Sequence, residues 1–237
     1  MPHTNDIPAP PRHEVRRRQL TARLTASLAA RLALVTGPAG SGKTAAVAQW
    51  ARALGQPVIW LALDDTDDDL DRFRSRLLDA IPGAAASRDL PLSECLASVH
   101  HEMVLVCDGV DAIEDPQTIA MVDELCADAP VTMHIVLIGR AVPALARLTR
   151  LRLNGDLQEI TADELRCNDA EAESLLDALE YKHEPEDRAE LLGRTEGLIA
   201  AVALAGVLAR DHEGRSIDTF NGATAEFAQY LYSEVLD

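Results

Sequence analysis

The stretch Gly37–Thr44 constrains the chain more than any other part, because it fits the phosphate-binding pattern GxxxxGK[ST] at every fixed position. An apolar run at 32–36 predicts a buried strand entering it, and an Ala-rich run at 45–54 predicts a helix leaving it. The glycines let the backbone curl so that its N–H groups face phosphate oxygens. The pattern predicts a nucleotide-phosphate site formed by Gly37, Pro38, Ala39, Gly40, Ser41, Gly42, Lys43, Thr44 and Ala45.

Two side chains of this stretch indicate how a phosphate would be held. Lys43 is expected to reach the β- and γ-phosphates, and the Thr44 hydroxyl is expected to hold Mg²⁺. Lys43 and Lys182 are the two lysines of a chain otherwise rich in arginine, so the lysine here is not a default basic residue. The alternative, a Gly-rich turn with no ligand, fits the flanking strand and helix less well.

Charge and composition narrow the class of protein. The net charge of −17 argues against nucleic-acid binding by this chain, because that affinity comes largely from Lys and Arg on phosphates. The four cysteines lack the spacing of a zinc site or a disulfide framework. No N-terminal signal peptide is visible, and the longest apolar run, 198–209, is too short to span a bilayer. We expect a soluble, cytoplasmic protein with no membrane partner.

Further apolar runs predict the rest of an α/β fold with a five-stranded parallel sheet. The predicted strands are 58–63, 103–107, 133–138 and, at an edge, 157–160. Asp108 directly follows the third strand, where its carboxylate is predicted to meet the Mg²⁺ held by Thr44. Arg140 follows the fourth strand, where it would either sense a γ-phosphate or pair with a surface acid. The P-loop NTPase class implies the strand order 5-1-4-3-2.

The remaining segments divide the chain. The acidic run 64–69 is interpreted as a solvated loop that caps the next helix, with a metal cluster as the alternative. After Ile160 the period becomes helical. Helices are expected at 163–180, 188–192, 197–210 and 217–237. We expect a flexible lead-in at 1–13, a nucleotide-binding domain at 14–160 and a helical lid domain at 161–237, which ends at the connection to a winged-helix domain outside this chain.

Several motifs together resemble one branch of the P-loop class. They are Arg17-Arg18-Gln19-Leu20, Thr36–Thr44 with Gln49-Trp50, Trp60–Asp65, Gly139-Arg140, Thr195-Glu196-Gly197-Leu198 and Tyr230-Leu231. This set resembles the nucleotide-binding domain of the signal-transducing ATPases with numerous domains (STAND), and within them the MalT-like, LuxR-type large ATP-binding transcription regulators. The resemblance runs over nearly the whole chain.

The resemblance implies a switch that binds ATP or ADP with Mg²⁺ and hydrolyses ATP slowly. ADP would hold a closed monomer, and an inducer acting through a C-terminal sensor domain outside this chain would permit ATP-dependent self-association. DNA would be bound by a helix-turn-helix outside this chain. Gly197 and Leu198 would close over the nucleotide, Arg140 would sense the γ-phosphate, and the backbone around Val15 and Arg17 would contribute to the adenine pocket.

Two departures from the family pattern matter. The family has a second acid directly after Asp108, where this chain has Gly109, so hydrolysis would depend on Asp111 or Glu114. On this basis Gly109→Asp is expected to raise turnover. The family often has proline where this chain has Ile199.

Two other functions stay open. One is a small-molecule kinase, whose lid would carry Arg147, Arg150 and Arg152. The other is a degenerate P-loop protein that binds nucleotide without turnover, which the glycine after Asp108 keeps open.

Overall fold

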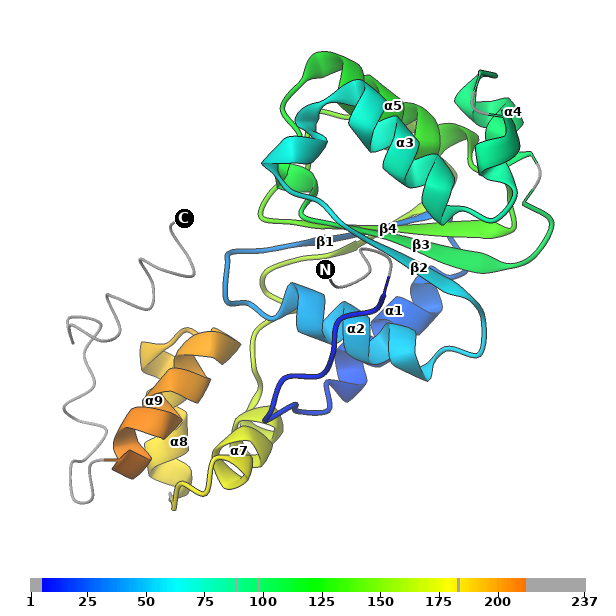
Figure 1. Ribbon diagram of the computed structural model, residues 1–237. Helices are drawn as coiled ribbons and strands as arrows, with labels where there is room; N and C mark the ends of the chain where they lie inside the picture. Colours follow the sequence, from blue (N-terminus) through cyan, green and yellow to red (C-terminus); the bar gives the residue numbers. More distant parts are fainter. Residues whose placement is uncertain (1–5, 88, 98, 183, 212–237) are drawn as a thin grey trace.

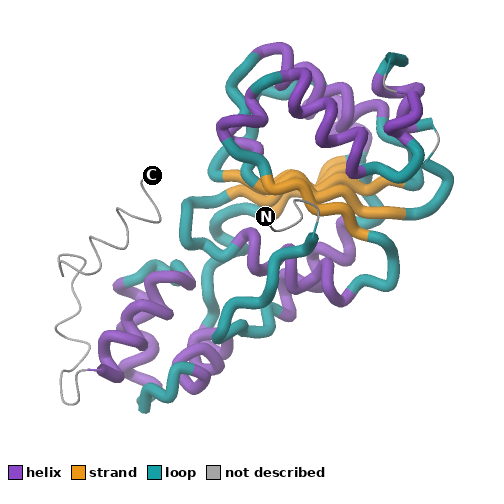
Figure 2. Tube along the Cα trace, viewed as in Figure 1, coloured by secondary structure: helices purple, strands orange, loops and turns teal. Residues whose placement is uncertain are grey.

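The computed structural model describes residues 6–211 apart from 88, 98 and 183. A central sheet has helices on both faces, and a smaller helical part lies beside it (Figures 1 and 2). The strands are β1 Leu32–Thr36, β2 Val58–Ala62, β3 Met103–Asp108, β4 Met133–Gly139 and β5 Leu157–Ile160. They are parallel in the order β2-β3-β4-β1-β5, which confirms the predicted order read from the other edge. The helix expected at 217–237 lies outside the described residues.

The apolar strands form because both faces of the sheet are buried. Along β1, Leu32 and Leu34 join the hydrophobic cluster on one face, whereas Ala33 and Val35 join the cluster on the other. Successive side chains of a strand point to opposite faces of the sheet. Because helices cover both faces of this parallel sheet, every position along the strand needs an apolar residue. All carboxyl ends of the strands therefore meet at one edge, where the loop after β1 and the residues after β3 and β4 come together.

Each face has its own helices (Figure 1). Helices α1 and α2 cover one face, and α3, α4 and α5 cover the other. Trp50 of α2 and Trp60 of β2 are both 1% exposed and belong to the cluster that contains Ala33 and Val35. The helix bounds are α1 Arg18–Ser27, α2 Lys43–Ala53, α3 Leu70–Ala80, α4 Leu92–Leu96, α5 Pro116–Asp128 and α6 Leu148–Asn154, with short 3₁₀ turns η1 Asp65–Asp68, η2 Ala84–Ser87 and η3 Val110–Ala112.

The helical part has its own small core. It consists of α7 Asp169–Ala178, α8 Pro185–Arg194 and α9 Ile199–Asp211. Its buried cluster also takes in Val15 from the segment before α1, whereas Ile7 of the same segment packs against the cluster under the sheet. Two helix starts differ from the predicted ones for local reasons. Asn168 forms a capping box that starts α7, and Pro185 occupies the first turn of α8.

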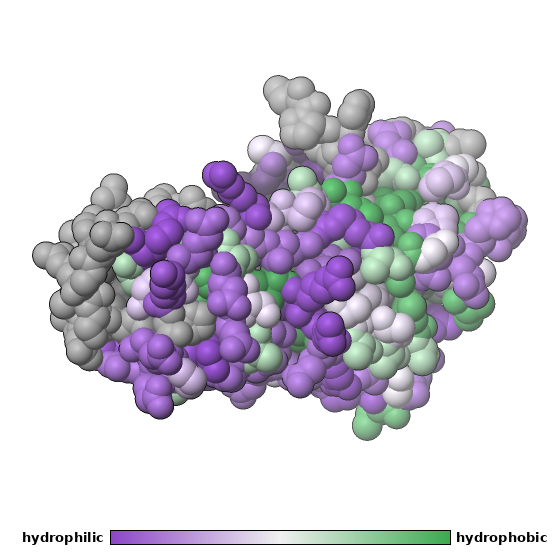
Figure 3. Space-filling model, turned by 90° about the horizontal axis from the view of Figure 1, so that it is seen from below, coloured by the Kyte–Doolittle hydropathy of each residue, from purple (hydrophilic) through white to green (hydrophobic). Residues whose placement is uncertain are grey.

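The surface agrees with the acidic composition. The face in Figure 3 is mostly hydrophilic, with hydrophobic residues gathered in smaller patches between the polar ones. In the described part of the chain, no helix combines the length and apolar character needed to cross a membrane.

Candidate nucleotide-binding site

The predicted phosphate loop joins β1 to α2 and curls through two glycines in the left-handed region. Gly40 has φ +76° and Gly42 has φ +83°, a conformation that other residues adopt only under strain. Space is limited as well. A Cβ on Gly40 would lie 3.1 Å from Ala200 Cβ, and one on Gly42 would lie 2.9 Å from Ile199 Cγ2. The loop is thus a narrow cradle directly against the start of α9.

Lys43, the first residue of α2, extends along this loop. Its Nζ donates to Gly37 O at 2.8 Å and to Pro38 O at 2.9 Å. Burial lowers the pKa of Lys43, and the nearby carboxylates of Asp111 and Asp108 only partly offset that effect. The ammonium group therefore lies at the loop mouth between backbone carbonyls and carboxylates, within reach of a group bound in the cradle.

Thr44 and Asp108 meet as predicted. Thr44 Oγ1 donates to Asp108 Oδ1 at 3.1 Å, which joins the start of α2 to the end of β3. Burial raises the pKa of Asp108 to about 6, against the opposing effects of the Thr44 hydrogen bond and the Lys43 charge. A hydroxyl and a carboxylate beside a phosphate loop are oxygen donors of the kind Mg²⁺ prefers. The donor set therefore fits a magnesium–nucleotide complex.

Gly109 cannot simply be exchanged for the acid found in the family. Its φ is +92°, and a Cβ there would lie 2.6 Å from the carbonyl oxygen of Leu63. Gly109→Asp would therefore first displace the loop after β2, and its effect on turnover stays a prediction. A glycine at this position allows the ends of β2 and β3 to approach, with Leu63 N donating to Asp108 O at 2.7 Å.

Asp111 and Arg140 form one unit at the same edge of the sheet. Asp111 accepts from the backbone N–H of Arg140 at 3.0 Å and from its Nε at 2.7 Å. Burial raises the pKa of Asp111, but the Arg140 hydrogen bonds outweigh it and keep the pKa below its ordinary value. The pairing of Arg140 with an acid is therefore observed, and its contact with a γ-phosphate stays a prediction. Arg140 lies at the predicted edge of the sheet.

A cavity of about 680 Å³ extends from the phosphate loop into the helical part. Val15 and Arg17, predicted for the adenine pocket, line it together with the loop and the start of α2, including Ala45. Gln49 and Ile199, which the family motifs single out, also line it. The motifs did not indicate the rest of the lining, which is Leu175, Leu179, Ala200, Ala203, Leu204 and Val207, with residues 11–14. The pairs 175/179 and 203/207 have helical i, i+4 spacing, but that spacing also describes ordinary core residues.

The glycine motif of the helical part has two different environments. Leu198 lies against the loop, since a Cβ on Gly40 would be 3.6 Å from Leu198 Cδ2. The backbone N–H of Ala200 donates to Gly40 O at 3.1 Å. Gly197 instead packs against Arg166 and Cys167 and accepts from Cys167 N at 2.7 Å. The motif thus sets the start of α9 on the loop, with Ile199 filling the space beside Gly42.

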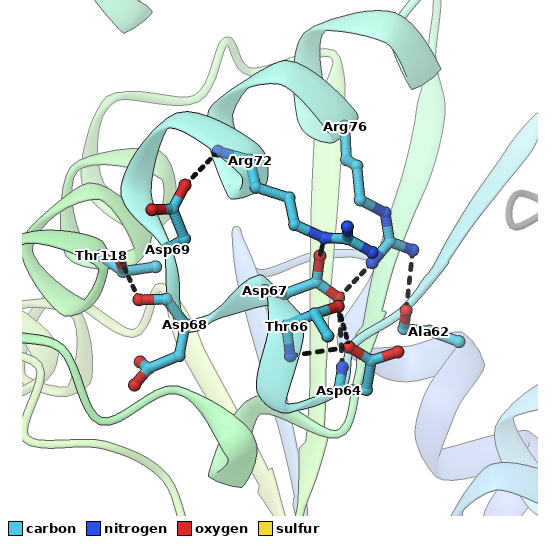
Figure 4. Close-up of polar contacts among 9 residues, drawn as sticks. All are labelled: Ala62, Asp64, Thr66, Asp67, Asp68, Asp69, Arg72, Arg76 and Thr118. Carbon is cyan, nitrogen blue, oxygen red and sulfur yellow. Dashed lines mark hydrogen bonds and ion pairs between the residues drawn. The ribbon is translucent and has the colours of Figure 1, made fainter.

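The acidic run after β2 is a built structure and not simply a solvated loop. Figure 4 shows Asp67 between Arg72 and Arg76, which both approach its carboxylate. Asp67 is fully buried, so the interpretation as a solvated loop is wrong for this residue, although Asp64, Asp65 and Asp69 are exposed. The capping role is confirmed, because Asp69 accepts from Arg72 N at the start of α3. Among the described residues, no group of three or more His, Cys, Asp or Glu side chains is arranged to hold a metal.

The arginines considered for a kinase lid lie away from the phosphate loop. They belong to α6 and the residue before it, which lead into the start of β5 at the opposite edge of the sheet. The sequence did not predict α6. Arg147 contacts Asp123 and Asp128, and Arg152 contacts Glu159. This geometry removes the observation that favoured the kinase.

Fold and phosphate loop together define a P-loop NTPase. A Walker-type ATPase of Pyrococcus abyssi superimposes with a TM-score of 0.60, covering 95% of this chain and 76% of that one at 13% identity. The Orc1 protein of Aeropyrum pernix in complex with DNA gives a TM-score of 0.53, covering 94% and 66% at 16% identity. At these identities the likeness concerns the fold alone. No family model matches the chain.

Sequence similarity narrows the class. The chain is 30% identical over 249 residues to the HTH-type transcriptional regulator MalT of Klebsiella pneumoniae strain ATCC 700721, and 30% identical over 251 residues to MalT of strain 342. Each match covers 95% of this chain and 27% of the regulator. The chain is thus homologous to MalT over nearly its whole length, which confirms the resemblance predicted from its motifs, and it spans about a quarter of the regulators' length.

Proposed function

We propose that the chain is the ATP/ADP-binding switch module of a signal-responsive, LuxR-type transcription regulator. One observation carries the proposal. Lys43, Thr44 and Asp108 lie together at the mouth of the glycine loop. The cavity at this point continues between the segment before α1 and the helical part. The homology to MalT supports the regulator context. For the whole protein we propose, in addition, an inducer that acts through a sensor domain, ATP-dependent self-association and a DNA-binding element, the sensor domain and the DNA-binding element lying outside this chain.

The residues take the following roles in the proposal. The loop N–H groups and Lys43 bind the phosphates, and Thr44 and Asp108 hold Mg²⁺. A bound Mg²⁺ would neutralise charge on the phosphate oxygens. Arg140 interacts with the γ-phosphate. The apolar side chains of α7 and α9, with the backbone near Val15, enclose the base, because nucleotide sites combine an apolar wall with few polar groups.

We propose slow ATP hydrolysis for this module. The second family acid is replaced by Gly109, and Asp111 is engaged with Arg140, so neither supplies an unengaged carboxylate next to Asp108. The same observation favours a second candidate, a P-loop module that binds nucleotide without turnover. The two candidates share the site and differ in rate.

A titration tests the proposed function. ATP and ADP, each with Mg²⁺, are titrated calorimetrically into the wild-type chain and into Lys43→Ala. We expect saturable binding by the wild type and its loss in the variant, because the bound phosphates lose their main point charge. The control is Lys182→Ala, which removes the other lysine and is expected to bind as the wild type does. Equal affinity of Lys43→Ala and wild type would refute the assignment.

A further inference from the structure

Arg17 is a buried cation at the joint between the two parts of the molecule. Its side chain is 4% exposed. Its Nη2 donates to the carbonyl oxygens of Leu165 at 2.8 Å and Arg166 at 3.1 Å, about 150 residues along the chain. These carbonyls lie in the segment that leads from β5 to α7, so a residue just before α1 holds the entry to the helical part.

The charge of Arg17 is balanced from α7. Its Nε lies 3.0 Å from Oε2 of Glu171, whose side chain is 7% exposed. The Nε–H does not point at an acceptor, so the contact is an ion pair and not an aligned hydrogen bond. Glu171 is itself fixed, because its Oε2 accepts from Asn168 N at 3.2 Å in the capping box that starts α7.

The backbone of the segment that contains Arg17 is hydrogen-bonded to α2, the helix that follows the phosphate loop. Gln49 of α2 accepts from the backbone N–H of Arg17 at 2.8 Å and donates to Val15 O at 2.9 Å. Val15 belongs to the hydrophobic cluster of the helical part. The short segment 15–17 is therefore bound to α2 through its backbone and to the helical part through its side chains.

A second guanidinium nitrogen of Arg17, Nη1, is buried beside the phosphate loop. Arg17 lines the nucleotide cavity, and its Nη1 would be 3.6 Å from a Cβ built on Gly42. This buried Nη1 has no hydrogen-bond partner among the described residues. Buried donors of a guanidinium are costly to leave unpaired, so an acceptor bound beside Gly42 would supply a hydrogen bond that Nη1 lacks.

We propose that Arg17 and Glu171 form a latch that holds the helical part closed over the phosphate loop and thereby slows the release of a bound nucleotide. The latch rests on the proposed function, because it regulates the same site. In the closed structure the Arg17 charge lies out of water and depends on Glu171. Opening of the helical part would return both groups to water. Removal of the Glu171 charge therefore disfavours the closed arrangement relative to the open one.

Glu171→Gln is the sharpest variant for this proposal. Glutamine keeps the size of the side chain and an oxygen that accepts from Asn168 N, so the capping box persists while the charge is lost. The matched control is Glu164→Gln, which removes the exposed ion pair between Glu164 and Arg23 at the same joint. Exposed pairs contribute little, so the control is expected to behave as the wild type.

The readout is the dissociation rate of a fluorescent ADP analogue, chased with excess ADP in the presence of Mg²⁺. We expect Glu171→Gln to release the analogue at least tenfold faster, equivalent to about 1.4 kcal/mol, and Glu164→Gln to release it at the wild-type rate. Measurements are made well below the unfolding temperature of each variant, so a loss of stability alone does not change the rate.

The outcomes separate the latch from the proposed function. Failure of the wild type to bind the analogue would remove the proposed function. Binding by the wild type with unchanged release from Glu171→Gln, or equal acceleration in Glu164→Gln, would overturn the latch alone. If Glu171→Gln does not fold, Arg17→Lys takes its place. It keeps the charge but lacks the planar fork that places Nη2 at the two carbonyls and Nε beside Glu171 at once, and it is also expected to accelerate release. Release at the wild-type rate from that variant would overturn the latch.

Discussion

Replacement of Gly109 by alanine tests the geometry at the end of β3 without changing any charge. Gly109 has φ +92°, its N–H donates to Ile138 O at 2.9 Å, and a Cβ would lie 2.6 Å from Leu63 O. The left-handed conformation costs an ordinary residue about 1–2 kcal/mol. Contact with a backbone oxygen adds about 1–3 kcal/mol, because the chain has to move. We expect Gly109→Ala to lose about 3 kcal/mol of unfolding free energy.

Gly155→Ala is the matched control. Gly155 also has a left-handed φ, +76°, but a Cβ there would meet nothing within 4 Å. That variant should show the conformational cost alone, about 1–2 kcal/mol. Urea unfolding followed by tryptophan fluorescence measures both, because Trp50 and Trp60 are buried around the sheet. Equal losses in the two variants would refute the argument that Leu63 O excludes a side chain at position 109.

Two further predictions concern the half-buried carboxylate of Asp108 and the buried carboxylate of Asp67. Because burial raises the folded-state pKa of Asp108 to about 6, ionisation of Asp108 costs stability as the pH rises from about 4 through 6. With no nucleotide and with chelator present, Asp108→Asn should therefore be more stable than wild type at pH 7.5 by about 3 kcal/mol and show no gain at pH 4. An equal difference in urea unfolding at both pH values would contradict this. Asp67→Ala leaves the Arg76 guanidinium without its buried partner and should lose about 3 kcal/mol of unfolding free energy. The exposed Asp65→Ala is expected to change it by less than about 0.5 kcal/mol, and similar losses would show that the burial of Asp67 does not matter.

The sheet and the loop could be predicted because local sequence specifies them. In a chain with a phosphate loop, a continuous apolar run such as Val104–Val106 predicts a parallel strand that is buried on both faces of the sheet. Thr44 and Asp108 follow from the same logic, since parallel strands bring their carboxyl ends to one edge. The strand order came from the P-loop class and not from the residues.

The rest of the candidate site depends on contacts between distant segments. The pairing of Asp111 with Arg140 and the burial of Asp67 between two arginines are choices among many opposite charges in an acidic chain. The spacing of residues does not select between them. The apolar wall from α7 and α9 has the pattern of any helical core, so its place in a cavity was not predictable from sequence. Arg17 was expected to contribute through its backbone, and the sequence did not indicate that its guanidinium would hold the segment before α7.

The measurement that tests the central claim most directly is nucleotide retention. The wild-type chain and Lys43→Ala are incubated with Mg²⁺ and either ATP or ADP and then desalted. The protein is denatured, and the released nucleotide is identified and quantified by chromatography. The account predicts near-stoichiometric adenine nucleotide from the wild type and little from Lys43→Ala. Equal, trace amounts from both proteins would contradict the assignment of Gly37–Thr44 as a nucleotide site in a closed switch module.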